Sequence, residues 1–276
     1  MKAIPLTDHY GVELQDFNAS DSLDDEDLAT LRSAFDQGVV LLRDQEITDD
    51  EHDRFVKSLG ELHVYPWGTT VEYMSNVIPN NNSIAGTRRL LFHTDGIYGD
   101  HVAPGTCLYA MEVSPTSPPT AFVDCTWAYD QLSDKMKAEI EHLHGYHTFD
   151  VSAAHEDRDP ERYRMADHPG TEHLEHIKTA VHPIVTTVPH SGRKALFVNE
   201  FNTSHIVEYG PDSEHGEELL QALFSSLYDE RNLYTHHYSK NDLVIWNNLA
   251  VQHARTARID RNPRTFRRLV ISALNW

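Results

Sequence analysis

Apolar residues recur at helical spacing near the start of the chain and at strand spacing along most of the remainder. In residues 22–37 (SLDDEDLATLRSAFDQ), one predicted helical face carries Leu28, Leu31 and Phe35. Ser22 is the expected N-cap of this helix, and acidic residues fill its first turn. The run GVVLLRDQ at 38–45 predicts a buried strand, and 48–59 (TDDEHDRFVKSL) predicts a second capped helix that Gly60 closes.

After about residue 90 the pattern changes to short β-rich runs, several of them separated by turn residues. These runs are PGTCLYAMEV, TAFVD, HPIVTTV, KALFVN, DLVIW and RRLVISAL. Helical patterns interrupt them at 126–144 and 213–230. This order of elements predicts a mostly β (α+β) domain, with flanking helices and a core of jelly-roll type.

The chain shows no repeat of fixed period and no low-complexity linker, so we expect residues 1–276 to form a single domain. Residues 148–176, approximately, are polar, contain proline and are rich in histidine, arginine and acidic residues. Long loops inside compact domains are often functional. We therefore expect this stretch to form a lid-like insert.

Charge and cysteine content narrow the class of protein. Acidic residues outnumber basic ones by 43 to 23, which gives a net charge of −20. Such a surface repels phosphate backbones and anionic lipid, so neither nucleic acid nor a membrane is an expected partner. Cys107 and Cys125 are too few for a disulfide framework, and no signal-like start or membrane-length apolar run is present. These features predict a cytoplasmic protein.

The stretch FHTDGIYGD contains the first candidate for chemistry, the pair His93 and Asp95. If residues 90–95 end a strand, positions two apart point to the same face, and the imidazole and the carboxylate converge. A hard divalent metal that also accepts nitrogen would suit them, provided that a third ligand exists. With 19 histidines in the chain, the pair alone could arise by chance.

Other histidines form competing groups along the chain. Each is best explained as a set of partly exposed polar residues, since none has a carboxylate two positions on in a convincing strand. An HExxH pattern of a zinc protease helix is absent from the sequence. The competing groups are His142, His144 and His147; His173 and His176; and His236 and His237.

The C-terminal part supplies the missing ligand together with a cluster of arginines. His253 follows a predicted strand and turn, and Arg264 and Arg268 lie four apart in a β-like run. They therefore project to one face, and Arg267 projects to the other. A buried guanidinium requires an anion, and its fork suits a carboxylate. Two histidines and one carboxylate on one face leave three open positions, which suits non-haem Fe(II) and O2 activation.

At this point the chain resembles the taurine dioxygenase and 2,4-dichlorophenoxyacetate dioxygenase (TauD/TfdA) family of Fe(II)/2-oxoglutarate-dependent oxygenases. The family's HxD motif matches His93-Thr94-Asp95, its distal histidine matches His253, and its 2-oxoglutarate threonine and arginine match Thr120 and Arg264. The segments GVVLLRDQEITDDEHDRFVKSLGEL, TAFVDCTWAYDQLSDKMKAEIEHL and SGRKALFVNEFNTSHI also look like family segments, so the similarity spans almost the whole chain.

The resemblance implies a double-stranded β-helix (cupin-like) core and a hydroxylase that uses Fe(II), 2-oxoglutarate and O2 and releases succinate and CO2. His93, Asp95 and His253 would bind the metal and serve as the catalytic centre, and Thr120 and Arg264 would bind 2-oxoglutarate. Desaturation, cyclisation and epoxidation are variants of the same chemistry. Because Asp95 is present, halogenation is not favoured. Family members often form dimers or tetramers, so a homo-oligomer is open.

The substrate is expected to be a small, anionic or amino-acid-like molecule. The candidates for contacting it are Arg268, which matches a family arginine that meets substrate anions in several members, and Arg88, Arg89, Tyr98 and Tyr65. For the arginines the plain alternative is a surface salt bridge, and for the tyrosines a core or rim position.

The sequence departs from the family before the distal histidine. The family's Trp-Asp-Asn-Arg is Trp246-Asn247-Asn248-Leu249 here, which should alter hydrogen bonding but not metal ligation. The segment NNNSIAGTRRLLF lacks the side chains with which the taurine enzyme binds its substrate. Two other functions stay open: a cupin-like metalloenzyme that does not use 2-oxoglutarate, and a non-catalytic binding relative.

Overall fold

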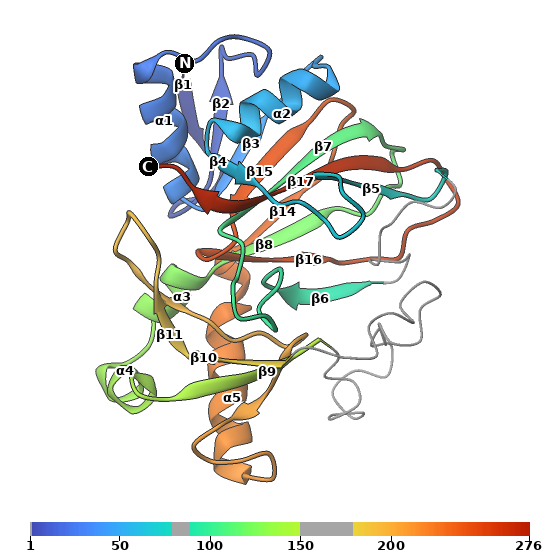
Figure 1. Cartoon of the computed structure of the whole chain (residues 1–276). Coiled ribbons are helices and arrows are strands. Elements are labelled where there is room, and N and C mark those ends of the chain that lie inside the picture. The colour runs from blue at the N-terminus through green and yellow to red at the C-terminus, as the bar shows by residue number, and fades with distance from the viewer. Residues whose placement is uncertain (1, 79–88, 150–178) are drawn as a thin grey trace.

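Two β-sheets stacked face to face form the centre of the molecule in the computed structural model, which describes residues 2–78, 89–149 and 179–276 (Figure 1). The larger sheet has the order β1 (Lys2–Pro5), β2 (Val12–Gln15), β3 (Val39–Leu42), β15 (Leu243–Asn247), β7 (Gly105–Glu112), β17 (Thr265–Leu274) and β4 (Gly60–Leu62), and β5 (Val71–Ser75) also pairs with β17. The smaller sheet has the order β14 (Leu233–His236), β8 (Thr120–Asp124), β16 (Val251–Arg255) and β6 (Leu90–His93). All these pairs are antiparallel except β2 with β3, so the predicted mostly β, jelly-roll core is confirmed.

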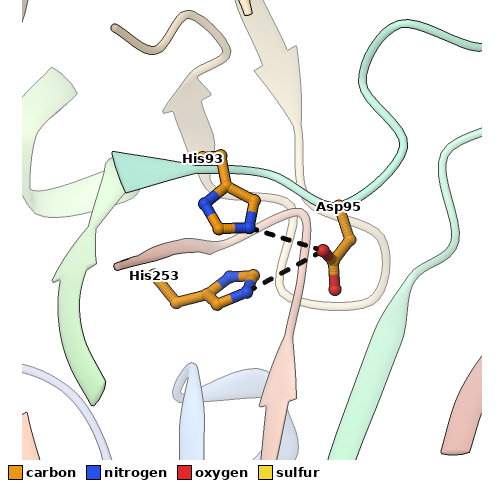
Figure 2. A group of neighbouring side chains, drawn as sticks. All are labelled: His93, Asp95 and His253. Atoms are coloured by element: carbon orange, nitrogen blue, oxygen red, sulfur yellow. Dashed lines mark ion pairs between the residues drawn. The ribbon is translucent and has the colours of Figure 1, made fainter. Parts of the chain in front are cut away.

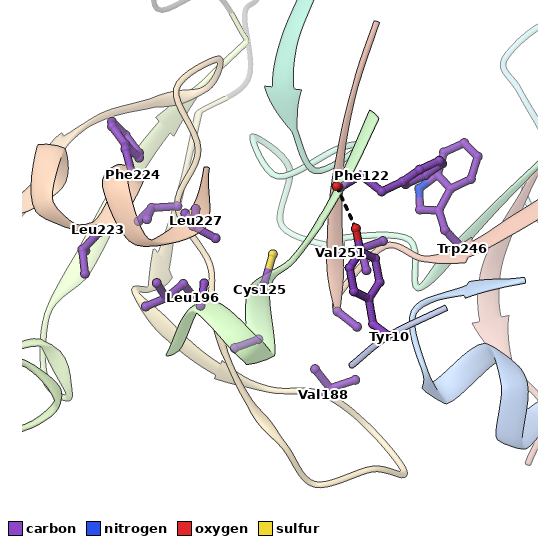
Figure 3. Close-up of a cluster of buried hydrophobic side chains, with 14 of the residues drawn as sticks. Tyr10, Phe122, Cys125, Val188, Leu196, Leu223, Phe224, Leu227, Trp246 and Val251 are labelled. Atoms are coloured by element: carbon purple, nitrogen blue, oxygen red, sulfur yellow. Dashed lines mark hydrogen bonds between the residues drawn. The ribbon is translucent and has the colours of Figure 1, made fainter. Parts of the chain in front are cut away.

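The main hydrophobic core lies between the two sheets. The larger sheet contributes Leu41, Leu108 and Val244, and the smaller sheet contributes Phe122 and Val251. Each of these side chains alternates with residues on the other face of its strand, as the period of two requires. Figure 3 shows how this core continues from Phe122 and Trp246 past Cys125 toward Leu223, Phe224 and Leu227.

Two amphipathic helices cover the outer face of the larger sheet. Buried residues of α1 (Asp25–Asp36) and α2 (Asp49–Lys57) pack there on apolar residues of β3, β15 and β17. The N-cap of α2 is Thr48, whose capping box with Glu51 confirms the predicted start. The expected cap at Ser22 was wrong. Asp24 caps α1, because its carboxylate accepts from two backbone N–H groups of the first turn.

Gly60 does not close α2 in the way that its position predicted. The helix ends through Ser58 in an ordinary right-handed conformation, and Gly60 begins strand β4. A Cβ atom at this position would overlap the backbone carbonyl oxygen of Ala273. Glycine is therefore required here by the close approach of β4 to β17, not by a helix cap.

The remaining helices and two small sheets lie beside the smaller sheet, in the lower half of Figure 1. The single helix predicted at 126–144 was wrong: Ser133 caps a new helix, so the segment divides into two, and β9 begins at His144. The helix predicted at 213–230 is confirmed, with Ser213 as its N-cap. The elements of this region are α3 (Cys125–Asp130), α4 (Asp134–Ile140), β9 (His144–Thr148), β10 (Thr179–Pro183), β11 (Val185–Thr187), β12 (Lys194–Leu196), β13 (Thr203–Ile206), α5 (Glu214–Leu227) and the 3-10 helix η4 (Glu230–Asn232).

Three expectations from the sequence can be compared with this architecture. Cys107 and Cys125 are both buried free thiols. Among the described residues, no helix is long and apolar enough to cross a membrane. The predicted lid at 148–176 lies outside the described residues except for its first two positions.

Tyr10 provides a test of how the N-terminal segment is joined to the smaller sheet. Its buried hydroxyl donates to the backbone carbonyls of Phe122 and Asn232, at 2.8 and 3.1 Å; the first bond is drawn in Figure 3. We predict that Tyr10→Phe lowers the free energy of unfolding by about 1–3 kcal/mol, because buried carbonyls lose their donor. Urea denaturation measures this change. Tyr209→Phe is the control, since Tyr209 is exposed and its hydroxyl has no hydrogen bond within the described chain; equal losses would contradict the prediction.

Candidate active site

The side chains of His93, Asp95 and His253 meet at one point between the sheets. His93 ends β6 and pairs directly with His253 of the neighbouring strand β16. Asp95 lies in the turn just beyond β6, so that turn, and not strand alternation as predicted, brings its carboxylate back. The Nε2 atoms of the two histidines lie 3.6 and 3.8 Å from Asp95 Oδ1, as the dashed lines in Figure 2 show. Within the described ranges, this is the one group of residues arranged to hold a metal ion.

The surroundings of the two imidazoles favour their neutral forms, and for His93 they also place the proton. His93 Nδ1 donates to the backbone carbonyl of Leu91 at 2.8 Å, so its Nε2 carries the lone pair. Burial lowers the pKa of His93 and lowers that of His253 to about 3. Neutral imidazoles at neutral pH are what metal ligation requires.

The two oxygens of Asp95 have different surroundings. Oδ2 accepts from Arg268 Nη2 at 2.6 Å and from Thr106 Oγ1 at 3.0 Å, which leaves Oδ1 facing the histidines. Burial by itself would raise the pKa of Asp95, but Arg268 and then the two histidines lower it well below the usual range. The carboxylate is therefore ionised and has one oxygen available as a ligand.

Asn248 fixes the backbone of Asp95 from the other side of the site. It lies in the turn between β15 and β16, where its Oδ1 accepts from Asp95 N–H at 3.0 Å. Its Nδ2 donates to the carbonyl of Asp95 at 2.9 Å and to that of Ala103 at 2.9 Å. A signal for this role was present in the motif, because Asn248 stands where the family motif before the distal histidine also has asparagine. Its neighbour Asn247 accepts from the backbone N–H of Leu249.

Arg264 lines the same cavity as His93, Asp95 and His253, and it has no anionic partner within the described part of the chain. It is 3% exposed, its guanidinium lies 4.2 Å from the centre of the Phe266 ring, and its Nε has no hydrogen-bond partner there. Burial lowers its pKa to about 10, so it remains a cation at neutral pH. A buried, unpaired guanidinium is costly unless an anion joins it.

Thr120 begins β8 and lines the cavity with Arg264. The hydroxyl of Tyr238 donates to Thr120 Oγ1 at 3.1 Å, which directs the proton of the threonine hydroxyl elsewhere. Tyr238 was not identified from the sequence, because no motif marks it. Its position next to Thr120 results from the pairing of β14 with β8, in which His236 lies opposite Thr120 and Tyr238 follows two residues later.

A cavity of about 390 Å³ joins these groups. It is lined by His93, Asp95, His253, Thr120, Arg264 and Arg268, and also by the predicted substrate residues Tyr65 and Tyr98. Arg89 is not among its lining residues, and Arg88 lies outside the described residues. The sequence did not point to Glu72, which also lines the cavity. An apolar wall beside His93 consists of Leu90, Phe149 and Phe201, against which Tyr98 packs.

The competing histidines contribute nothing to this cavity where they are described. His147 is buried in the small sheet of β9, beside Thr203, and His236 bonds the buried carboxylate of Asp242. His142, His144 and His237 lie outside the cavity lining, and His173 and His176 lie outside the described residues.

Comparison with known proteins identifies the family of this chain. Residues 2–270 match the family model described as "Taurine catabolism dioxygenase TauD, TfdA family", and the chain belongs to that family. It is 26% identical to pentalenolactone F synthase of Streptomyces avermitilis, over 91% of this chain and 87% of that protein. It is also 26% identical to the alpha-ketoglutarate-dependent 2,4-dichlorophenoxyacetate dioxygenase of Cupriavidus pinatubonensis, over 95% and 94% of the two chains.

A solved structure gives the same result for the fold. The crystal structure of AAD-2 in complex with Mn(II) and N-oxalylglycine superposes with a TM-score of 0.80 at 26% identity, covering 99% of this chain and 98% of that one. The protein is thus a 2-oxoglutarate-dependent dioxygenase with a double-stranded β-helix core, and its class uses Fe(II), 2-oxoglutarate and O2 on small-molecule substrates. The resemblance inferred from the motifs is confirmed.

Asn248 allows a test of how the site is held together. We predict that Asn248→Ala weakens Fe(II) binding about tenfold or more, because the backbone of Asp95 loses two hydrogen bonds to this side chain and that of Ala103 loses one. Anaerobic titration calorimetry with Fe(II) measures the affinity. Asn275→Ala, at an exposed position near the C-terminus, should leave it unchanged. An Asn248→Ala protein that binds Fe(II) as tightly as the parent would contradict this role.

Proposed function

We propose that His93, Asp95 and His253 hold Fe(II) in this protein and that Arg264 and Thr120 hold 2-oxoglutarate beside it. One observation carries the proposal: a two-histidine, one-carboxylate group shares a cavity with a buried arginine that lacks an anion among the described residues. The donor set suits Fe(II) with open positions, and the arginine suits the distal carboxylate of the co-substrate.

The bound iron, 2-oxoglutarate and O2 would supply the oxidising chemistry, with release of succinate and CO2. The protein's own groups then have defined tasks. Arg268 and Thr106 orient Asp95 so that Oδ1 alone meets the metal. Arg264 binds and orients the co-substrate, aided by the Thr120 hydroxyl. The apolar wall of Leu90, Phe149 and Phe201 limits water beside His93.

Two alternatives from the sequence are less well supported. A cupin-like metalloenzyme that does not use 2-oxoglutarate would have no need of a buried, unpaired arginine facing its metal. A non-catalytic relative would be expected to lose a metal ligand, whereas all three are present and oriented.

Further features of the function belong to the same proposal. The chain would act as one domain, 1–276, in the cytoplasm, with neither nucleic acid nor a membrane as partner, and as a monomer or a homo-oligomer such as a dimer or tetramer. Hydroxylation is the reaction we favour, and desaturation or cyclisation at the same centre are its variants. The cavity supports Tyr65 and Tyr98 as substrate contacts.

Arg264 decides between the proposed function and the alternative without 2-oxoglutarate. We predict that Arg264→Gln raises the KM for 2-oxoglutarate by about 100-fold or more, since a charge-assisted, bidentate carboxylate contact is lost in a buried site. Succinate release at varied 2-oxoglutarate concentration measures the change. Arg258→Gln, an exposed arginine in the same C-terminal segment, is the control and should leave the KM unchanged. Unchanged kinetics in Arg264→Gln would refute the assignment.

The metal assignment has a test of its own. We predict that His253→Ala abolishes the weak visible absorption band that Fe(II) and 2-oxoglutarate form together without O2, because the chelate needs the intact three-residue face. Anaerobic spectroscopy detects the band. His237→Ala replaces an exposed histidine away from the cavity and should retain it. A parent protein that shows no band at saturating Fe(II) and 2-oxoglutarate would overturn the proposed function.

A further inference from the structure

Arg268 is the arginine that the sequence matched to a substrate-anion contact, yet its guanidinium is already paired on two sides. Nη2 donates to Asp95 Oδ2 at 2.6 Å, and Nη1 donates to Glu72 Oε2 at 2.7 Å. Both distances are typical of charge-assisted hydrogen bonds. The two carboxylates raise the pKa of Arg268 against the effect of its burial. The guanidinium is thus a fixed cation whose charge is matched within the protein.

Glu72 is held in this position by the sheet itself. It lies on β5 directly opposite Arg268 on β17, so the two side chains share one face of adjacent strands. Glu72 is 5% exposed, and the hydroxyl of Tyr65 donates to its Oε2 at 3.2 Å. Moving this carboxylate away would leave its own buried charge unpaired and would remove one of the two carboxylates that bind Arg268.

Among the described residues, the charges around the cavity can be assigned to partners one by one. In the proposed function, the distal carboxylate of 2-oxoglutarate matches Arg264, and Fe(II) shares the charge of Asp95. Arg268 is then matched by Glu72. Arg255 also lines the cavity, and it has an interaction of its own. An anionic substrate group that approached Arg268 would meet the negative charge of Glu72 within the same buried region.

Of the described residues, those beside Tyr98 and along β5 and β17 make much of the remaining cavity wall apolar and aromatic. Tyr98 packs edge-on against Phe149, with ring centres 4.8 Å apart, and Phe201 packs edge-on against His93 at 5.5 Å. Met74 and Val270 also line the cavity, each on the same strand as Glu72 or Arg268 and two residues further along. These side chains can contact the apolar or aromatic part of a substrate, and none of them carries a charge.

We propose that Glu72 is a specificity-determining residue that neutralises Arg268, so that the cavity takes an uncharged, largely apolar small molecule and not an anion. Arg268 acts as a positioning residue that holds Asp95, not as the receptor for a substrate carboxylate or sulfonate. This inference rests on the proposed function for the places of iron and 2-oxoglutarate. It replaces the anionic substrate that the sequence led us to expect.

The test compares acetate with acetamide, two probes of nearly equal shape that differ in charge. Each is titrated by calorimetry into the protein loaded with Fe(II) and 2-oxoglutarate without O2. The parent protein should bind acetate no more tightly than acetamide. In Glu72→Ala, the vacated space and the exposed charge of Arg268 should make acetate bind at least about tenfold more tightly than acetamide. Acetate should also raise the Tm of Glu72→Ala and leave that of the parent unchanged, because it fills the position of the missing carboxylate.

The double variant Glu72→Ala/Arg268→Met identifies the site of binding, since it should lose the gained preference for acetate. The proposal is overturned by a parent protein that prefers acetate tenfold, by a Glu72→Ala protein without the preference, or by a double variant that keeps it. Failure of the proposed function would be seen separately, as absence of the Fe(II)–2-oxoglutarate absorption band. Even then, the difference between the parent and Glu72→Ala reports on Arg268, because Arg264 is the same in both.

Discussion

The direct pairing of His93 with His253 across two adjacent strands is the constraint on which the rest of the site depends. Antiparallel neighbours place the two imidazoles side by side, with ring centres 4.2 Å apart, on the face that looks toward the larger sheet. Residues opposite each other on one face are the closest side-chain pairs that a sheet offers. Once that pair is set, only one further ligand is needed, and the turn after β6 returns Asp95 to it. The metal face is thus a product of strand register, which a shift of one residue would destroy.

The second organising element is the alternation of arginines along β17. Arg268 points between the sheets and binds Asp95, whereas Arg267 points to the opposite face and binds Asp53 and His52 of α2. On this one strand, Arg268 therefore holds the carboxylate of the site, and Arg267 binds the strand to helix α2 on the outer face. Buried cations in both positions are matched by carboxylates, which is the condition for their burial. Arg264 differs in having no such partner among the described residues, and this contrast is the physical basis for assigning it to a ligand.

The difference between an arginine with a carboxylate partner and one without also affects substrate specificity within the family. An arginine at the position of Arg268 can meet a substrate anion only if its charge is not already matched. Here a glutamate across the strand pair matches it, so a single residue on β5 changes what the cavity can recognise while the metal face stays the same. The substrate range of such an enzyme then depends on whether the charge of this arginine is matched within the cavity wall. The type of reaction depends on the metal and the co-substrate.

The sequence by itself determined the reaction class and most of the elements. Strand and helix periods, capping residues and the ordered motif His93, Asp95, Thr120, His253 and Arg264 were enough, because each depends on local spacing or on a recognisable pattern. It misplaced the cap of α1 and the break between α3 and α4, because Asp24 and Ser133 act there as local caps. It also misread Gly60, whose role depends on the close approach of β17.

Only the tertiary structure decided which charges meet. Glu72 and Arg268 are far apart in the chain, and no motif links them. Their contact follows from the register of β5 on β17, which depends on the packing of the whole sheet. The roles of Tyr238 and Asn248 have the same origin, since each acts through a residue distant in sequence. Local spacing can identify ligands, but the pairing of buried charges is a property of the assembled sheets.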